Sequence, residues 1–121
     1  MQVTRPLHVA VLVSNLAQAE TFIGAAYWGL TKAERSLNFA GTWYQIGALQ
    51  LHLIESDSPP TPLVHTQKWG RKPHLALAIA DLGAAQSALS AAGLPYQLSA
   101  SGRAALFVCD PDGNIIELSQ S

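Results

Sequence analysis

The feature that most constrains the fold is an internal repeat at an offset of 66 residues. The first copy reads LHVAVLVSNLAQA around His8, and the second reads PHLALAIADLGAA around His74. The histidine, an alanine, a leucine and a second alanine coincide in the two copies without a gap. A repeat of this kind indicates that one supersecondary unit occurs twice in the chain.

Each copy carries the same order of local signals. A short apolar run, at residues 7–13 or 74–80, is followed by Asn15 or Asp81, which are suited to cap a helix. An apolar stripe at helical spacing follows in each copy and ends at a glycine. Three further strands are predicted in each copy, at residues 32–37, 42–46 and 49–54, and at residues 96–98, 103–109 and 114–119. The sequence therefore predicts an α+β fold made of two βαβββ modules.

The chain length predicts one domain, spanning residues 1–121, because 121 residues are too few for two ordinary domains. We expect the first module at residues 5–54 and the second at residues 73–121. Residues 55–72, which include three prolines, are predicted to form a linker or a flap. The single cysteine and the lack of a signal-peptide pattern at the N-terminus predict a cytoplasmic protein.

The charge content argues against two classes of partner. Seven Lys and Arg stand against eight Asp and Glu, and no segment concentrates positive charge, so we expect neither nucleic acid nor a membrane as partner. The apolar runs are too short to span a bilayer. Only 12% of the residues are charged and 49% are hydrophobic, which favours a homodimer with a buried interface.

Four potential metal ligands stand at matched places in the two modules. His8 and His74 begin the first strands, and His52 and Glu117 lie midway along the last strands. A two-fold relation between the modules would bring three imidazoles and one carboxylate to one point. Polar groups inside apolar strands are costly to bury unless they share a purpose. The pattern predicts a site for one divalent metal ion, namely Zn, Ni, Fe or Mn.

The doubled βαβββ unit, the His-x-Ala start of each half, the DPDGN turn and the closing IIEL resemble the vicinal oxygen chelate superfamily. This superfamily includes glyoxalase I, extradiol dioxygenases and bleomycin resistance proteins. The resemblance covers nearly the whole chain. It implies the curved, cup-like mixed sheet of the glyoxalase/bleomycin-resistance/dihydroxybiphenyl-dioxygenase fold. It also implies that His8, His52, His74 and Glu117 occupy the family ligand positions, between modules of one chain or of two.

Ligand number guides the choice of chemistry. Four protein ligands leave two free positions on an octahedral ion, which suits a small substrate with two adjacent oxygens. We therefore expect a metal-dependent glyoxalase-like isomerase or lyase that acts through a metal-stabilised enediolate. The resemblance to glyoxalase I assigns Glu117 as the catalytic base, although His52 stands where that enzyme usually has a second carboxylate. Two alternatives stay open, an extradiol-type iron-dependent dioxygenase and a metal-free protein that sequesters a small molecule as bleomycin resistance proteins do.

Four further residues are predicted to bind the substrate. The guanidinium of Arg103 could hold an anionic group. Trp43 and Tyr44 alternate along one strand, so that one of them faces the cup, and Phe107 is the matched residue of the second half. No distinctive cationic cluster is visible in the sequence, so a glutathione site is not predicted.

Overall fold

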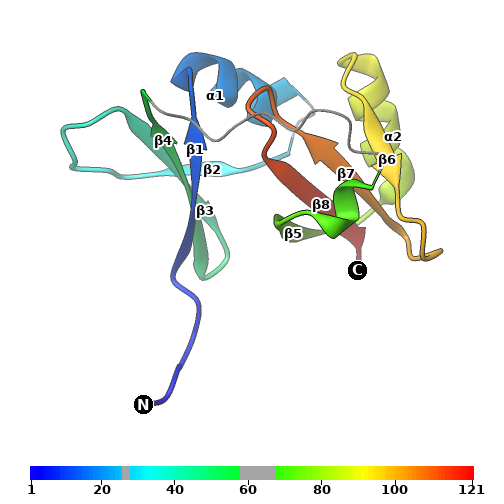
Figure 1. The fold of residues 1–121 in the computed structure, drawn as a ribbon, viewed down its shortest axis with the longest axis horizontal. Helices are drawn as coiled ribbons and strands as arrows, with labels where there is room; N and C mark the ends of the chain where they lie inside the picture. Colours follow the sequence, from blue (N-terminus) through cyan, green and yellow to red (C-terminus); the bar gives the residue numbers. More distant parts are fainter. Residues whose placement is uncertain (26–27, 58–67) are drawn as a thin grey trace.

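The computed structural model describes residues 1–25, 28–57 and 68–121, and it contains the two predicted βαβββ modules (Figure 1). The elements of the first module are β1 (His8–Val13), α1 (Leu16–Ala25), β2 (Thr31–Ala33), β3 (Gly41–Ile46) and β4 (Leu49–Glu55). Those of the second are β5 (His74–Ile79), α2 (Leu82–Ala91), β6 (Tyr96–Leu98), β7 (Ala105–Cys109) and β8 (Ile115–Gln120). A short 3-10 helix, η1 (Trp69–Arg71), precedes β5.

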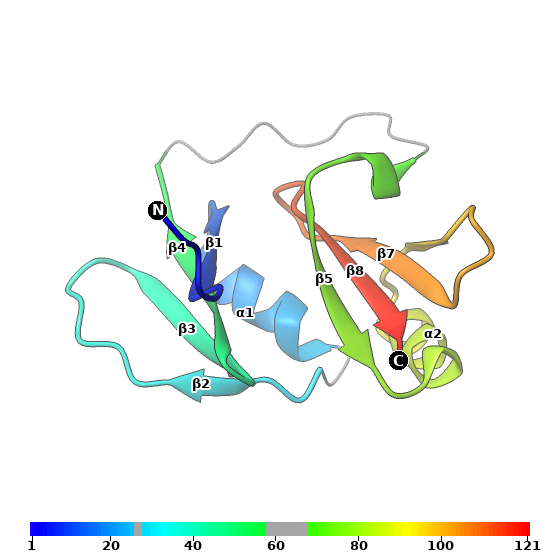
Figure 2. The same ribbon diagram turned by 90° about the horizontal axis from the view of Figure 1, so that it is seen from below.

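Each module forms its own four-stranded mixed sheet. The strand orders are β1-β4-β3-β2 and β5-β8-β7-β6, so that the two sheets repeat one topology. In each sheet the first strand pairs in parallel with the last, and the other pairs are antiparallel. Figures 1 and 2 show the sheets side by side, with α1 between them. The predicted fold class is confirmed.

The repeated sequence produces the same start for both helices. Asn15 and Asp81 each accept a hydrogen bond from a backbone amide three residues later, at 2.9 and 3.0 Å. Glu55 and Gln120, near the ends of β4 and β8, each accept a further bond at 2.7 Å from the first helical residue. Each helix has ten residues, and no helix in the described part of the chain is long and apolar enough to cross a membrane.

Two predicted strands are shorter than expected. The strand predicted at residues 32–37 ends at Ala33, because the following loop folds back and brings the guanidinium carbon of Arg35 to 4.6 Å from the ring centroid of Phe39. The strand predicted from residue 103 begins at Ala105, since Gly102 adopts a φ of 80° and the chain turns there. Arg103 therefore belongs to a turn and not to a strand.

One hydrophobic core contains residues of both modules. Leu51 and Leu53 of β4 and Ile116 and Leu118 of β8 belong to this core cluster. Because side chains alternate along a strand, the residue between each of these pairs lies on the opposite face of its sheet. The two sheet faces that carry the candidate ligands therefore lie outside the shared core.

The turn between β7 and β8 joins the second module to the end of β1. Asp112 Oδ2 accepts a hydrogen bond from the Ser14 amide at 3.0 Å, and the side-chain amide of Asn114 donates to the Leu12 carbonyl at 3.0 Å. Most of the predicted linker or flap, residues 58–67, lies outside the described residues.

Candidate metal centre

The structure brings the four predicted ligands together as two pairs. His8 and His52 form one pair in the first sheet, and His74 and Glu117 form the other in the second sheet. Within residues 1–25, 28–57 and 68–121, no three His, Cys, Asp or Glu side chains are placed to hold one metal ion. The arrangement of four donors at one point, expected from the sequence, is therefore not present in the described part of a single chain. The reason is that each pair lies on the open face of its own sheet.

The second pair is held by hydrogen bonds on both sides. The Nε2 atom of His74 lies 3.0 Å from Glu117 Oε2, while its Nδ1 donates to the Lys72 carbonyl at 2.6 Å. Arg103 Nη1 donates to Glu117 Oε1 at 3.0 Å. Glu117 is only 5% exposed, so this guanidinium compensates a buried negative charge.

The spacing of this pair fits both a hydrogen-bonded ion pair and two neighbouring ligands of one ion. Donor atoms at about 2.1 Å from an ion, with about 90° between them, lie about 3.0 Å apart. The observed separation of Nε2 and Oε2 is 3.0 Å. The bond from Nδ1 of His74 to the Lys72 carbonyl is the kind of contact that fixes the tautomer of a metal-binding histidine and leaves Nε2 to the metal. Arg103 binds Oε1 of Glu117 and so leaves Oε2, the other carboxylate oxygen, available to an ion.

The first pair has a different arrangement. The rings of His8 and His52 are stacked, with centroids 4.2 Å apart and planes at 12°. Nε2 of His52 lies 2.8 Å from Oε1 of Gln50, whose Nε2 donates to Gln45 Oε1. The orientation of the Gln50 amide makes His52 Nε2 the donor of this bond. An ion can bind that nitrogen only after Gln50 releases it.

The protonation of His52 suits a metal ligand. Burial of the ring, together with the nearby His8 and Arg35, lowers the pKa of His52 below its ordinary value of 6.5. The neutral imidazole, which is the form that binds metals, is therefore favoured at neutral pH.

The predicted substrate residues divide between the two faces of the sheets. The Trp43 ring stacks on His52, with centroids 4.3 Å apart, and Phe107 meets His74 edge-on at 5.4 Å. These two aromatic residues are matched, because each pairs in register with the candidate ligand of the neighbouring strand. Tyr44 belongs to the core cluster on the other face, so it does not lie beside the candidate ligands.

The sequence analysis did not identify the cations that lie near these two pairs, which are Arg35 in the first module and Lys68 and Arg71 in the second. The guanidinium carbon of Arg35 lies 6.0 Å from the Trp43 ring centroid, and its Nε and Nη2 atoms are buried without a hydrogen-bond partner among the described residues. Lys68 and Arg71 line a pocket together with Arg103. The only sequence signal was the KWGRK run at residues 68–72, which does not show what faces it in the fold.

Comparison with known proteins gives a likeness of structure without a match of sequence. No family model and no curated protein matches the chain. A solved structure assigned to the glyoxalase family, from Bacillus anthracis, has a TM-score of 0.79 and 18% identity over 100% of this chain and 98% of the other. The fosfomycin resistance protein FosX from Listeria monocytogenes has a TM-score of 0.74 and 17% identity over 99% and 95% of the two chains. A lactoylglutathione lyase from Agrobacterium tumefaciens has a TM-score of 0.69 and 16% identity over 100% and 96%.

Each of these structures aligns with 99% or more of the chain. All three sequences are less than 20% identical to the sequence of this chain. They confirm the glyoxalase/bleomycin-resistance fold that the sequence predicts, and at these identities the likeness is one of fold alone.

Proposed function

We propose that the protein is a metal-dependent enzyme of the glyoxalase type, an isomerase or lyase that acts on a small substrate with two adjacent oxygens. The observation that carries this proposal is the separation of 3.0 Å between His74 Nε2 and Glu117 Oε2, with the outer atoms of both side chains held by Lys72 and Arg103. The donor set of three imidazoles and one carboxylate suits Zn, Ni, Fe or Mn. When bound, such an ion would act as a Lewis acid toward the substrate oxygens.

The chain's own groups have distinct roles in this proposal. The Lys72 carbonyl orients His74, and Arg103 holds Oε1 of Glu117. Oε2 of Glu117, the oxygen that faces His74, would hold the metal, and it would move the proton once released from the ion, as the resemblance to glyoxalase I implies. The rings of Trp43 and Phe107, which lie against His52 and His74, exclude water from one side of each pair.

We propose further that the site is completed in a homodimer, with His8 and His52 from one copy and His74 and Glu117 from the other. The separation of the two pairs in one chain supports this arrangement. The surface near β1 also favours an interface, because Val3, Leu7 and Leu12 are 84%, 59% and 38% exposed. Figure 1 shows the N-terminal segment running away from the body of the molecule.

Elemental analysis tests the metal site directly. Protein purified without chelator should contain about one equivalent of a transition metal per chain, and the His74→Ala and Glu117→Ala variants should each contain much less. Absence of any binding, even after incubation with each candidate ion, would contradict the proposal and favour a sequestration protein. Oxygen uptake with catechols that depends on added iron would instead favour the dioxygenase.

Mixing two inactive variants tests the shared site. If the site is shared, a dimer of one His8→Ala chain and one His74→Ala chain has one intact site and one doubly altered site. After subunit exchange of equal amounts, about a quarter of all sites should regain metal binding, because half of the dimers are mixed. If each site is built within one chain, no site would regain metal binding. Light scattering that gives the mass of a monomer would also contradict the shared site.

A further inference from the structure

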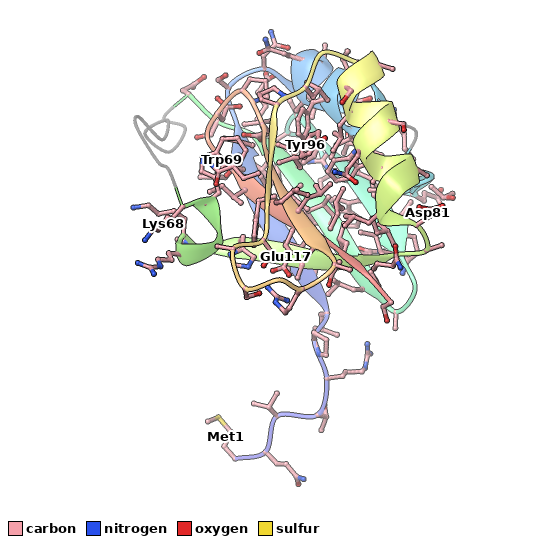
Figure 3. The ribbon with its side chains drawn as sticks, turned by 90° about the vertical axis from the view of Figure 1, so that its right-hand side faces the viewer. Met1, Lys68, Trp69, Asp81, Tyr96 and Glu117 are labelled. Carbon is pink, nitrogen blue, oxygen red and sulfur yellow. The ribbon has the colours of Figure 1, made fainter. Side chains whose placement is uncertain are left out.

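A cavity of about 470 Å³ lies beside the second candidate pair, and none of the four candidate ligands lines it. One wall is the segment around η1, with Lys68, Gly70 and Arg71, and the other is the turn after β6, which carries Ser99, Ser101 and Arg103. Figure 3 shows Lys68 at the edge of the molecule, with Glu117 farther in among the strands. This volume falls within the range of small-molecule sites.

The lining of this cavity is cationic. Lys68, Arg71 and Arg103 are three of the seven Lys and Arg residues of the chain, and among the described residues no Asp or Glu lines the cavity with them. Arg103 is paired with Glu117, whereas the ion pairs formed among the described residues include neither Lys68 nor Arg71. In a protein with a net charge of -1, this local excess of positive charge favours an anionic ligand.

Polar groups suited to an oxyanion line the same cavity as the cations. The Ser99 and Ser101 hydroxyl oxygens lie 2.8 Å apart, and Arg103 Nε donates to Ser101 Oγ at 3.1 Å. Hydroxyl groups beside guanidinium and ammonium groups are the donors that bind carboxylate and phosphoryl oxygens.

The two walls are fixed to each other. The Trp69 amide donates to Gln97 Oε1 at 3.0 Å, which ties η1 to β6. Gly70 lies so close to Phe107 that a Cβ atom would stand 2.7 Å from the end of the ring. The cavity is therefore formed before a ligand arrives, which reduces the entropy lost on binding.

The cavity is connected to the candidate metal centre through two of its own residues. Arg103 contacts Glu117, and Phe107 meets the His74 ring at 5.4 Å. A molecule in the cavity therefore lies one side chain away from the donor pair.

We propose that this cavity binds an anionic group of the substrate, a carboxylate or a phosphoryl-type oxyanion. This proposal rests on the proposed function, and it narrows the substrate class to small compounds with two adjacent oxygens and a separate negative charge. Lys68 and Arg71 bind that charge, and Arg103 links it to Glu117.

The test uses simple anions and protein freed of metal by a chelator, so that failure of the metal site does not affect the result. Inorganic phosphate and acetate are titrated separately, at constant ionic strength, while the backbone amide signals of Gly70, Ser99 and Ser101 are followed by NMR. We expect saturable shifts of these signals with at least one of the two anions. A stronger response to phosphate identifies a phosphoryl-type group, and a stronger response to acetate identifies a carboxylate.

Charge-matched variants separate a built site from general attraction of anions. The Lys68→Ala/Arg71→Ala variant should bind the anion at least tenfold more weakly, which corresponds to about 1.4 kcal/mol. The Arg5→Ala/Lys32→Ala variant loses the same charge elsewhere and should bind as the unaltered protein does. Equal weakening in both variants, or absence of saturable shifts with either anion, would overturn the proposal. Elemental analysis of the same proteins, taken before the chelator treatment, reports separately on the metal site.

Discussion

Replacement of Asn114 by Ala should weaken the junction between the two modules. The side-chain amide donates to the Leu12 carbonyl at 3.0 Å and to Asp110 Oδ2 at 2.8 Å. The first bond is partly exposed and contributes about 0.5–1 kcal/mol, and the second, to a buried carboxylate, contributes about 1.5–2 kcal/mol. We therefore expect Asn114→Ala to lower the free energy of unfolding by about 2–3 kcal/mol at pH 7.

The cost of this substitution should depend on pH. Burial raises the pKa of Asp110 above its ordinary value of 3.8, and the bond from Asn114 opposes that rise. The folded state therefore keeps its proton to a higher pH than the unfolded chain does, and stability falls as the pH rises through the raised pKa. Without Asn114 the pKa of Asp110 rises further, so the loss of stability should be largest near pH 7 and smaller near pH 4.

Urea denaturation of the metal-free protein and its variant, at pH 4.5 and pH 7.5, measures both effects. Asn38→Ala makes the same chemical change in an exposed loop and should alter stability by less than about 0.5 kcal/mol. A loss for Asn114→Ala that is the same at both pH values would refute the role of the charged bond. A loss no larger than that of Asn38→Ala would refute the whole account of the junction.

Two substitutions test the packing on which the site depends. Gly70→Ala should lower the free energy of unfolding by about 1–3 kcal/mol, because the new Cβ would stand 2.7 Å from Phe107 Cζ. Gly24→Ala is the control, since no atom lies within 4 Å of its Cβ, and it should leave stability unchanged or raise it. Denaturant titration measures both. Leu106→Ala, at a fully buried position in β7, should cost about 2–5 kcal/mol in the same assay, and a loss below 1 kcal/mol would show that the shared core is not formed as described.

The sequence predicted the modules well because they are determined by local patterns. The repeat around His8 and His74, the caps at Asn15 and Asp81 and the alternation of apolar residues each act over a few residues. They were enough to place His52 and Glu117 at matched positions within the last strands of the two modules. Hairpin and loop boundaries were less certain, since the folding back of Arg35 onto Phe39 depends on contacts that no local pattern encodes.

The relation between the modules could not be predicted in the same way. The repeat does not say whether the two open faces meet in one chain, and the described residues bring the four donors together only as two pairs. The cationic cavity was missed for a similar reason. Arg103 is more than thirty positions away from Lys68 and Arg71 in the sequence, and long-range contacts, namely Gly70 on Phe107 and the Trp69 amide on Gln97, bring them to one cavity.

The repeat itself shows how the two pairs differ and provides a last test. Gln50 pairs in register with His8, and the matched position of the second module, which pairs with His74, is Ile115. The second pair therefore has no neighbour like Gln50, whose Oε1 holds Nε2 of His52 at 2.8 Å. Gln50→Ile copies the second module and removes this competing bond, while a β-branched residue remains suitable for a strand. Since a net hydrogen bond is worth about 1 kcal/mol, the variant should bind the metal about fivefold more tightly in a competition assay with a coloured chelator. Unchanged or weaker binding would mean that His52 does not donate Nε2 to the metal, and that the first module contributes through His8 alone.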